Sequence, residues 1–97
     1  MAQLMHGRTL CEQIDTYLDY LQKTWAGIAL DAEEWAEWDD DSRLIFELNW
    51  AVPEDHLAQL NEWARQGQIT AEQRARYDQL LRLVAANRPL LNRMLAE

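Results

Sequence analysis

The chain has 97 residues and a formal net charge of −8, with 17 acidic against 9 basic residues. That length allows one domain with a thin core, and a hydrophobic fraction of 48% favours a folded chain over a disordered one. The negative charge disfavours direct binding to nucleic acid or to an anionic membrane surface, since both are recognised through Lys and Arg. One cysteine cannot form an internal disulfide, and no apolar run has the length of a signal peptide or a membrane span, so we expect a cytoplasmic protein.

Residues 9–27 are predicted to form the first helix, after a frayed tail over residues 1–8. Thr9 and Glu12 have the spacing of a capping box, in which each side chain accepts a hydrogen bond from the other residue's backbone N–H. Apolar residues then follow at alternating spacings of three and four, which is typical of a helix with one buried face. They are Cys11, Ile14, Leu18, Leu21, Trp25 and Ile28.

Residues 31–41 combine negative charge with large aromatic rings: seven of the eleven are acidic, two are tryptophan and none is basic. Asp31 and Glu34 repeat the spacing of a capping box, so Asp31 is predicted to begin a short second helix that ends near residue 39. Trp35 and Trp38 then lie on one face of that helix, three residues apart.

Residues 42–52 fit two kinds of secondary structure. The first is a strand, whose alternating apolar residues are Leu44, Phe46, Leu48, Trp50 and Val52. The second is a helix, whose apolar stripe is Leu44, Ile45 and Leu48. A helix is favoured, because the chain offers no second strand for pairing and an isolated hairpin is barely stable. The aspartates at the end of the preceding helix can cap this one.

Two further helices are predicted after Pro53, which suits the first turn of a helix. The fourth helix ends at Gly67, a residue type favoured just beyond a helix C-terminus. Its apolar face is Leu57, Leu60 and Trp63. A capping box at Thr70 and Gln73 begins the fifth helix. Its inward-facing residues are predicted to be Tyr77, Leu80, Leu81 and Val84.

Pro89 leaves two alternatives for the end of the chain. Either the fifth helix kinks at this residue, or it ends there and Asn87 caps a final short helix. No repeat or low-complexity linker divides the sequence. We therefore expect residues 1–97 to form one all-α domain, a helical bundle of five or six short-to-medium helices.

The stretch from Leu57 to Leu81 is similar to the short helical hairpins of the SHOCT type, which are found at the ends of many bacterial proteins. The shared residues are Leu57, Leu60, Gly67, Ile69, Thr70, Glu72, Leu80 and Leu81. The stretch departs from the pattern at Arg76 and Tyr77, and it lies inside the domain rather than at its end. The resemblance covers about a quarter of the chain and implies oligomerisation or docking rather than chemistry.

No residues form a recognisable catalytic or metal-binding pattern. The nucleophile and base candidates are Cys11, His6 and His56, which are interpreted as a core thiol, a residue of the frayed tail and a surface residue. The aspartates of residues 39–41 lack the central glycine and distal glutamate of a twelve-residue calcium loop. We therefore expect no enzymatic activity, no catalytic residue, no metal site and no cofactor.

The five tryptophans are expected to divide into two groups. Trp25, Trp50 and Trp63 lie on or near the apolar faces of their helices and are predicted to anchor the core. Trp35 and Trp38 lie among the acids, where they either contact a partner or pack against the first helix.

Charge is distributed unevenly along the chain, with a net −11 over residues 1–62 and +3 over residues 63–97. Tryptophans supply buried area in protein interfaces and carboxylates steer association, so the acidic segment is suited to a basic protein partner. The predicted partner-binding residues are Glu34, Trp35, Glu37, Trp38, Asp39, Asp40 and Asp41. As alternatives, the arginines of residues 63–97 pair with this segment inside one chain, or across a homodimer.

Three functions are compatible with these features. The first is a small acidic regulator, an antitoxin-like inhibitor that occludes a basic partner protein; in size, acidity and helicity the chain resembles the small inhibitors and antitoxins encoded beside bacterial toxins. The second is a structural adaptor or oligomerisation module of a larger assembly. The third is a DNA mimic that inhibits a nucleic-acid-binding protein, ranked lower because the acids are concentrated in one segment rather than spread along an extended face.

Overall fold

A computed structural model describes residues 9–96, and within this range the chain forms helices and short connections without any strand. The elements are α2 (Leu10–Ala26), α3 (Ile28–Glu34), the 3₁₀ helix η1 (Trp35–Glu37), α4 (Asp40–Asn49), α5 (Ala51–Arg65) and α6 (Ala71–Ala96). The all-α prediction is confirmed, and so is the preference for a helix over residues 42–52. Residues 1–8, predicted to be a frayed tail, lie outside the described residues.

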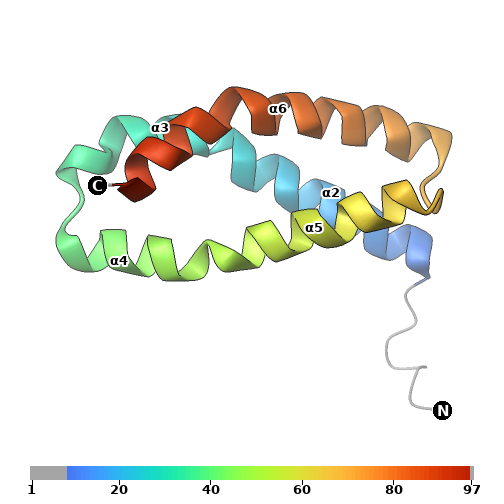
Figure 1. The fold of residues 1–97 in the computed structure, drawn as a ribbon, viewed down its shortest axis with the longest axis horizontal. Helices are drawn as coiled ribbons and strands as arrows, with labels where there is room; N and C mark the ends of the chain where they lie inside the picture. Colours follow the sequence, from blue (N-terminus) through green and yellow to red (C-terminus); the bar gives the residue numbers. More distant parts are fainter. Residues whose placement is uncertain (1–8, 97) are drawn as a thin grey trace, which may run out of the picture.

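The helices are arranged as three arms that run in alternating directions, rather than as five or six separate members of a bundle (Figure 1). α3 continues the direction of α2, α5 continues that of α4, and α6 forms the third arm alone. The two joins explain this difference from the prediction. Gly27 and Trp50 both keep right-handed helical backbone angles, with φ of −78° and −68°, so the chain does not reverse at either residue.

The second helix has its N-cap four residues earlier than predicted. α3 begins at Ile28, with Gly27 at the N-cap position, and Asp31 lies inside its first turn. The prediction that Asp31 caps this helix is therefore wrong: the backbone never leaves the helical region before residue 31, and a side-chain N-cap requires an extended residue. The segment does stop close to residue 39, because Trp38 and Asp39 are extended.

The chain reverses direction twice, and local side-chain signals fix both turns. At the first turn, the Asp39 carboxylate accepts a hydrogen bond of 2.7 Å from the Ser42 backbone N–H and so caps α4, as predicted. At the second turn, Gly67 has a φ of +74°, where a side chain would strain the backbone. The N–H groups of Gly67 and Gln68 donate to carbonyls of the last turn of α5 at 3.1 and 2.9 Å, which is the Schellman arrangement.

Two of the three predicted capping boxes are present. Thr9 and Glu12 exchange side-chain to backbone hydrogen bonds of 3.0 and 3.1 Å at the start of α2. Thr70 and Gln73 do the same at the start of α6, at 2.9 and 3.1 Å. Each box satisfies two backbone N–H groups that the first turn of a helix cannot pair internally.

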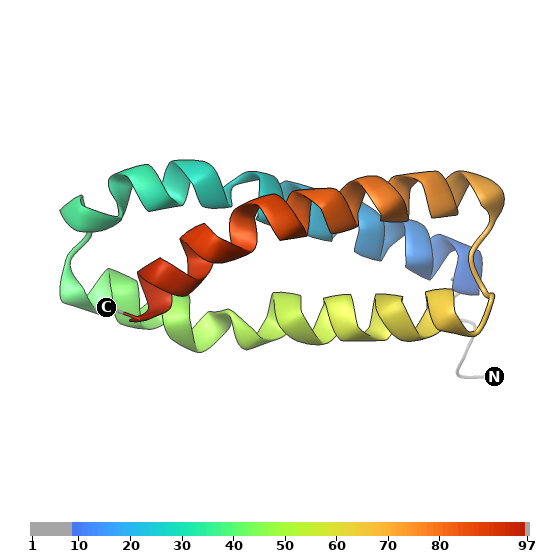
Figure 2. The ribbon, with the colours of Figure 1, turned by 45° about the horizontal axis from the view of Figure 1, so that its top comes forward.

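α6 runs without interruption through Pro89 and bends toward its C-terminal end (Figure 2). Of the two alternatives for this residue, the kinked helix is therefore the one observed. Proline has no N–H to donate to the carbonyl four residues earlier and its ring crowds that carbonyl, so a bend is the expected consequence. Asn87 does not cap a new helix: its side-chain amide donates to the Leu83 carbonyl at 2.9 Å.

The core lies between the three arms, with α2 packed against both α5 and α6. Its buried members are Ile14, Leu18, Leu21, Trp25, Ile28, Trp35, Trp50, Leu57, Leu60, Ala64, Tyr77, Leu80, Val84, Leu91 and Met94. Two predicted core residues are absent: Cys11 is exposed near the start of α2, and Leu81 is 38% exposed. Trp63 is half-buried against the core. The described chain measures 46 × 31 × 17 Å, long and flat as three side-by-side arms require.

Candidate functional site

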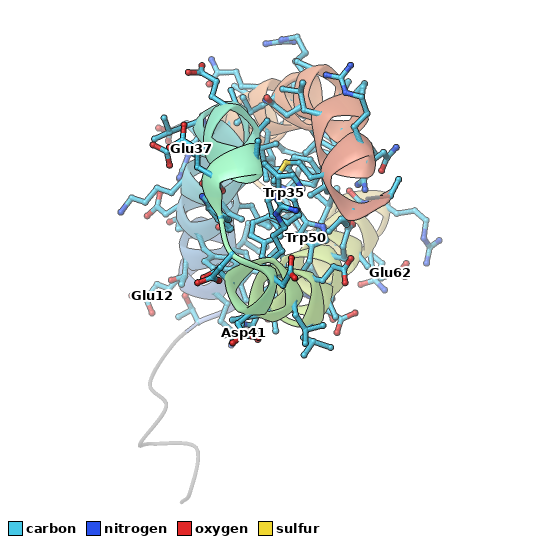
Figure 3. The ribbon with its side chains drawn as sticks, turned by 90° about the vertical axis from the view of Figure 1, so that its left-hand side faces the viewer. Glu12, Trp35, Glu37, Asp41, Trp50 and Glu62 are labelled. Carbon is cyan, nitrogen blue, oxygen red and sulfur yellow. The ribbon has the colours of Figure 1, made fainter. Side chains whose placement is uncertain are left out.

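The acidic segment of residues 31–41 covers one end of the bundle, where α3 and η1 turn into α4. Seen from that end, the Trp35 and Trp50 indoles point into the space between the arms, whereas Glu37 and Asp41 point away from it (Figure 3). Trp35 is only 5% exposed and Trp38 is half-buried. The two rings lie 5.3 Å apart between centroids. The carboxylates of the segment thus face outward, and its tryptophan rings face inward.

Trp35 lies beneath the acidic segment and contacts residues of α4. Its ring meets that of Phe46 edge to face at 5.4 Å. Arg43 donates a hydrogen bond of 3.0 Å from Nε to the Trp35 carbonyl, and its guanidinium lies 5.5 Å from the centre of the indole ring. Both contacts tie η1 to α4. Trp35 was predicted to bind a partner, but its burial gives it a supporting position under such a surface.

The carboxylates of the segment are in different environments. Asp39 is committed to capping α4, and the hydrogen bonds from Ser42 hold its pKa below the usual range. Partial burial raises the pKa of Asp31, and the charge of Glu34 adds to that effect. The remaining predicted partner-binding carboxylates are all exposed. They are Glu34, Glu37, Asp40 and Asp41.

The arginines of residues 63–97 do not neutralise these carboxylates. Arg76 pairs with Asp15 and Asp19 on α2. Arg88 pairs with Glu54 at 2.8 Å, and the remaining pair, between Arg65 and Glu62, lies within α5. Within residues 9–96, no ion pair involves an acid of residues 31–41, so the alternative of internal pairing with this segment is not observed. Its negative charge is left facing solvent.

An apolar row on α4 and the first turn of α5 lies next to this charge and is absent from the predicted partner-binding residues. Its members are Leu44, Ile45, Leu48 and Val52, which are exposed by 51, 57, 69 and 49%. α4 has no fully buried residue; its inner side is formed by Phe46, half-buried against the core. The signal was present in the sequence as the Leu44, Ile45 and Leu48 stripe. What the sequence did not reveal is that this stripe faces solvent.

A groove runs beside the row, between α2 and the α4–α5 arm. Its volume is about 380 Å³. It is lined by Tyr20, Thr24, Trp38, Ser42, Ile45, Phe46, Asn49, Trp50 and Pro53. Aromatic rings make up much of its wall: Phe46 stacks on Trp50 with 5.5 Å between ring centroids, and it meets Trp38 edge to face at 5.8 Å. Ile45 belongs to both the row and the groove, so the two form one continuous apolar surface.

The two catalytic candidates within residues 9–96, His56 and Cys11, each contact neighbouring groups. His56 is half-buried rather than fully at the surface: its Nδ1 donates to the Val52 carbonyl at 2.8 Å, and its ring packs on Tyr17 at 4.5 Å. The exposed Cys11 thiol accepts a hydrogen bond from Gln73 at 3.4 Å. His6 lies outside the described residues. Among residues 9–96, no group of His, Cys, Asp and Glu side chains is placed to hold a metal ion, and no helix has the length and apolarity needed to cross a membrane.

Comparison with protein-family models, with curated proteins and with solved structures finds no match to this chain. The resemblance of residues 57–81 to SHOCT-type hairpins therefore stays a prediction. The geometry of the stretch agrees with a helix, a glycine stop and a capped helix, which is what the shared residues alone require.

Proposed function

We propose that this protein is a small acidic regulator that binds a basic partner protein through the α4 face. This face is the apolar row of Leu44, Ile45, Leu48 and Val52 together with the exposed carboxylates of Glu37 and Asp41. The observation that carries the proposal is the exposed apolar row of α4 beside unpaired carboxylates. Exposed apolar surface supplies the free energy of association and carboxylates steer a basic partner toward it. The role is one of binding, without catalysis or a cofactor, and the single cysteine supports a cytoplasmic setting.

In its most specific form, the proposal is an antitoxin-like inhibitor of the kind encoded beside bacterial toxins, which occludes the basic surface of its partner. A structural adaptor is the second candidate, since an uncovered apolar row is also what a subunit of a larger assembly presents. The DNA mimic is the third. It has less support, because the acids gather at one end of the bundle, beside an apolar row, rather than along an extended face.

Charge reversal on the α4 face tests the proposal. The Glu37→Lys/Asp41→Lys variant should lose a basic partner that the wild-type protein captures from native lysate, as measured by quantitative mass spectrometry. The matched control is Glu72→Lys/Asp78→Lys, which changes the net charge equally on α6, and Glu72, like Asp41, lies in the first turn of its helix. Circular dichroism should show equal helicity in all three proteins.

Two results would contradict the proposal: equal capture by wild type and by the α4 variant, or equal loss of capture by both variants. Once the partner is known, its activity separates the candidates. An inhibitor should suppress that activity at a one-to-one ratio, whereas an adaptor should leave it unchanged.

A further inference from the structure

The apolar row and the groove form an elongated surface along the α4–α5 arm. On a helix, residues at spacings of three and four share one face, and the row follows this rule from residue 44 to residue 52. Asp41 and Asp55 have the same spacing to either end of it, and both are exposed. The helical backbone at Trp50 carries the row across the join between α4 and α5. A line of apolar side chains thus has a carboxylate at each end.

We propose that this surface is the docking site for a basic amphipathic helix of the partner, which inserts one large apolar side chain into the groove. The inference rests on the proposed function and adds to it the form and chemistry of the occupant. The partner helix places its apolar stripe along Leu44, Leu48 and Val52, and its basic residues reach Asp41 and Asp55.

The length of the row fits a helical occupant. At 1.5 Å per residue, the apolar row extends over about 12 Å and the two aspartates stand about 21 Å apart. An amphipathic helix of four turns covers that span, with apolar residues at positions i, i+4 and i+7 and a basic residue about one turn beyond each end. Ion pairs between the basic residues at the ends of the partner helix and Asp41 and Asp55 also fix the position of that helix along the row.

The groove fits an anchor side chain. Ile45 forms its edge next to the row, and the rings of Trp38, Phe46 and Trp50 form its wall. Interfaces are commonly held by a large apolar side chain, tryptophan especially, in a pocket that excludes water. Ser42 and Asn49 place polar groups among the lining residues, beside that apolar wall.

A second copy of this chain fits the surface less well. Self-docking through α4 brings the aspartates and Glu47 of one copy toward the same carboxylates of the other, and like charges in contact oppose association. Arg43 is the basic residue within α4, and it is already bound to the Trp35 carbonyl. Charge complementarity therefore selects a basic occupant over a second acidic chain.

Binding of a synthetic peptide to the full chain tests the inference. The probe is a fluorescein-labelled helix of about 18 residues, with leucine along one face, tryptophan at the centre of that face and lysine elsewhere. Fluorescence anisotropy measures its dissociation constant. Three control peptides replace the tryptophan by alanine, replace every lysine by glutamate, or scramble the order to remove the apolar face.

Matched protein variants show where the peptide binds. Leu48→Asp should weaken binding about tenfold or more, whereas Leu30→Asp, on a leucine of α3 that is 57% exposed, should leave it unchanged. Asn49→Trp fills the groove and should remove the preference for tryptophan over alanine at the peptide's centre. Its control, Asn92→Trp at an exposed position of α6, should keep that preference.

The inference is overturned if the tryptophan peptide does not bind, if the scrambled peptide binds equally well, or if Leu30→Asp weakens binding as much as Leu48→Asp does. It is also overturned if sedimentation shows a dimer of the wild-type chain that Leu48→Asp dissociates, since a second copy then covers the row. Failure of the peptide while the lysate capture still depends on Glu37 and Asp41 would leave the proposed function intact. If the peptide binds as expected but the lysate capture does not depend on Glu37 and Asp41, the proposed function is contradicted instead.

Discussion

Glu54 connects the α4–α5 arm to α6 and to the core. Its carboxylate accepts a hydrogen bond of 2.7 Å from the Trp50 indole N–H and two from Arg88, at 2.8 and 3.3 Å. The same Arg88 guanidinium lies 4.9 Å from the centre of the buried Trp25 ring. The Arg88 hydrogen bond, more than the one from Trp50, lowers the pKa of Glu54 even though partial burial opposes that change. Glu54 and Arg88 together thus link α5, α6 and the Trp25 ring of α2.

Glu54→Gln should therefore destabilise the protein by about 1 kcal/mol, since it keeps the shape of the side chain and removes the charge that strengthens these hydrogen bonds. The matched control is Glu62→Gln, on the same helix, whose ion pair with Arg65 is exposed. That control should leave the free energy of unfolding unchanged within error. Urea denaturation of the three proteins makes the comparison, and equal losses in the two variants would show that the Glu54 contacts have no special weight.

The contribution of Glu54 should also depend on pH in a defined direction. Its pKa is lowered by folding from an ordinary value near 4.5. Such a group stabilises the folded state fully above its unfolded pKa, and this stabilisation is lost as the pH falls through the folded pKa. The stability difference between wild type and Glu54→Gln should therefore be constant near neutral pH and shrink below about pH 4.5. A difference that grows in acid would contradict the assigned contacts.

The two glycines at helix ends within residues 9–96 adopt different backbone conformations. Gly67 adopts a φ of +74°, and no atom lies within 4 Å of the Cβ that a substitution would add. Gly27 has right-handed helical angles, and an added Cβ there meets two backbone carbonyl oxygens at an ordinary 3.6 Å. The first glycine is thus needed for its backbone conformation, and the second is not.

Gly67→Ala should destabilise the protein by about 1 kcal/mol through backbone strain alone. Gly27→Ala should be neutral or should stabilise it by up to about 1 kcal/mol, because alanine favours the helical backbone that this residue already has. Thermal denaturation followed by circular dichroism measures both. The assignment of the turn at residue 67 would be wrong if both substitutions had the same sign and size.

Sequence patterns were sufficient for the ends of most helices. The caps at Thr9, Asp39 and Thr70 and the glycine stop at residue 67 were all predicted correctly, because each depends on hydrogen bonds between residues within four positions of each other. Asp31 had the same spacing to Glu34 and was wrongly assigned as a cap. Asp31 differs from these caps in the backbone conformation of the residues before it, and residue spacing does not specify that conformation.

Burial was predicted best for α2, the helix that two other arms cover. The apolar stripe of α2 was largely correct, since α5 and α6 both cover it, with only Cys11 outside the covered part. In the fifth predicted helix, Leu80 is fully buried and its neighbour Leu81 is 38% exposed. The apolar row of α4 is the largest difference. Which of two apolar faces meets the core depends on how distant arms pack, and periodicity within one helix does not contain that information.

At the scale of the whole molecule, negative charge is concentrated rather than spread. Seven acids stand in the eleven residues 31–41, and within residues 9–96 no ion pair offsets any of them. Their mutual repulsion opposes the compact state, and dissolved salt screens it.

The melting temperature should therefore rise by a few degrees between about 20 mM and about 500 mM sodium chloride. Replacing three exposed acids, in the variant Glu33→Gln/Glu34→Gln/Glu37→Gln, should raise the melting temperature at low salt and reduce its dependence on salt. Differential scanning calorimetry measures both effects. A melting temperature that falls with salt in the wild-type protein would show that its ion pairs outweigh its repulsion.

The packing of α2 against α6 has a consequence for how the chain matures. Protein synthesis proceeds from the N-terminus, so residues 10–26 emerge from the ribosome long before residues 71–96. Until then α5 alone can cover α2, and the positions that Leu80, Leu91 and Met94 fill in the finished core stay empty. The native fold therefore closes only after the last arm has been released, and any chaperone or partner that meets the growing chain earlier finds the apolar face of α2 open.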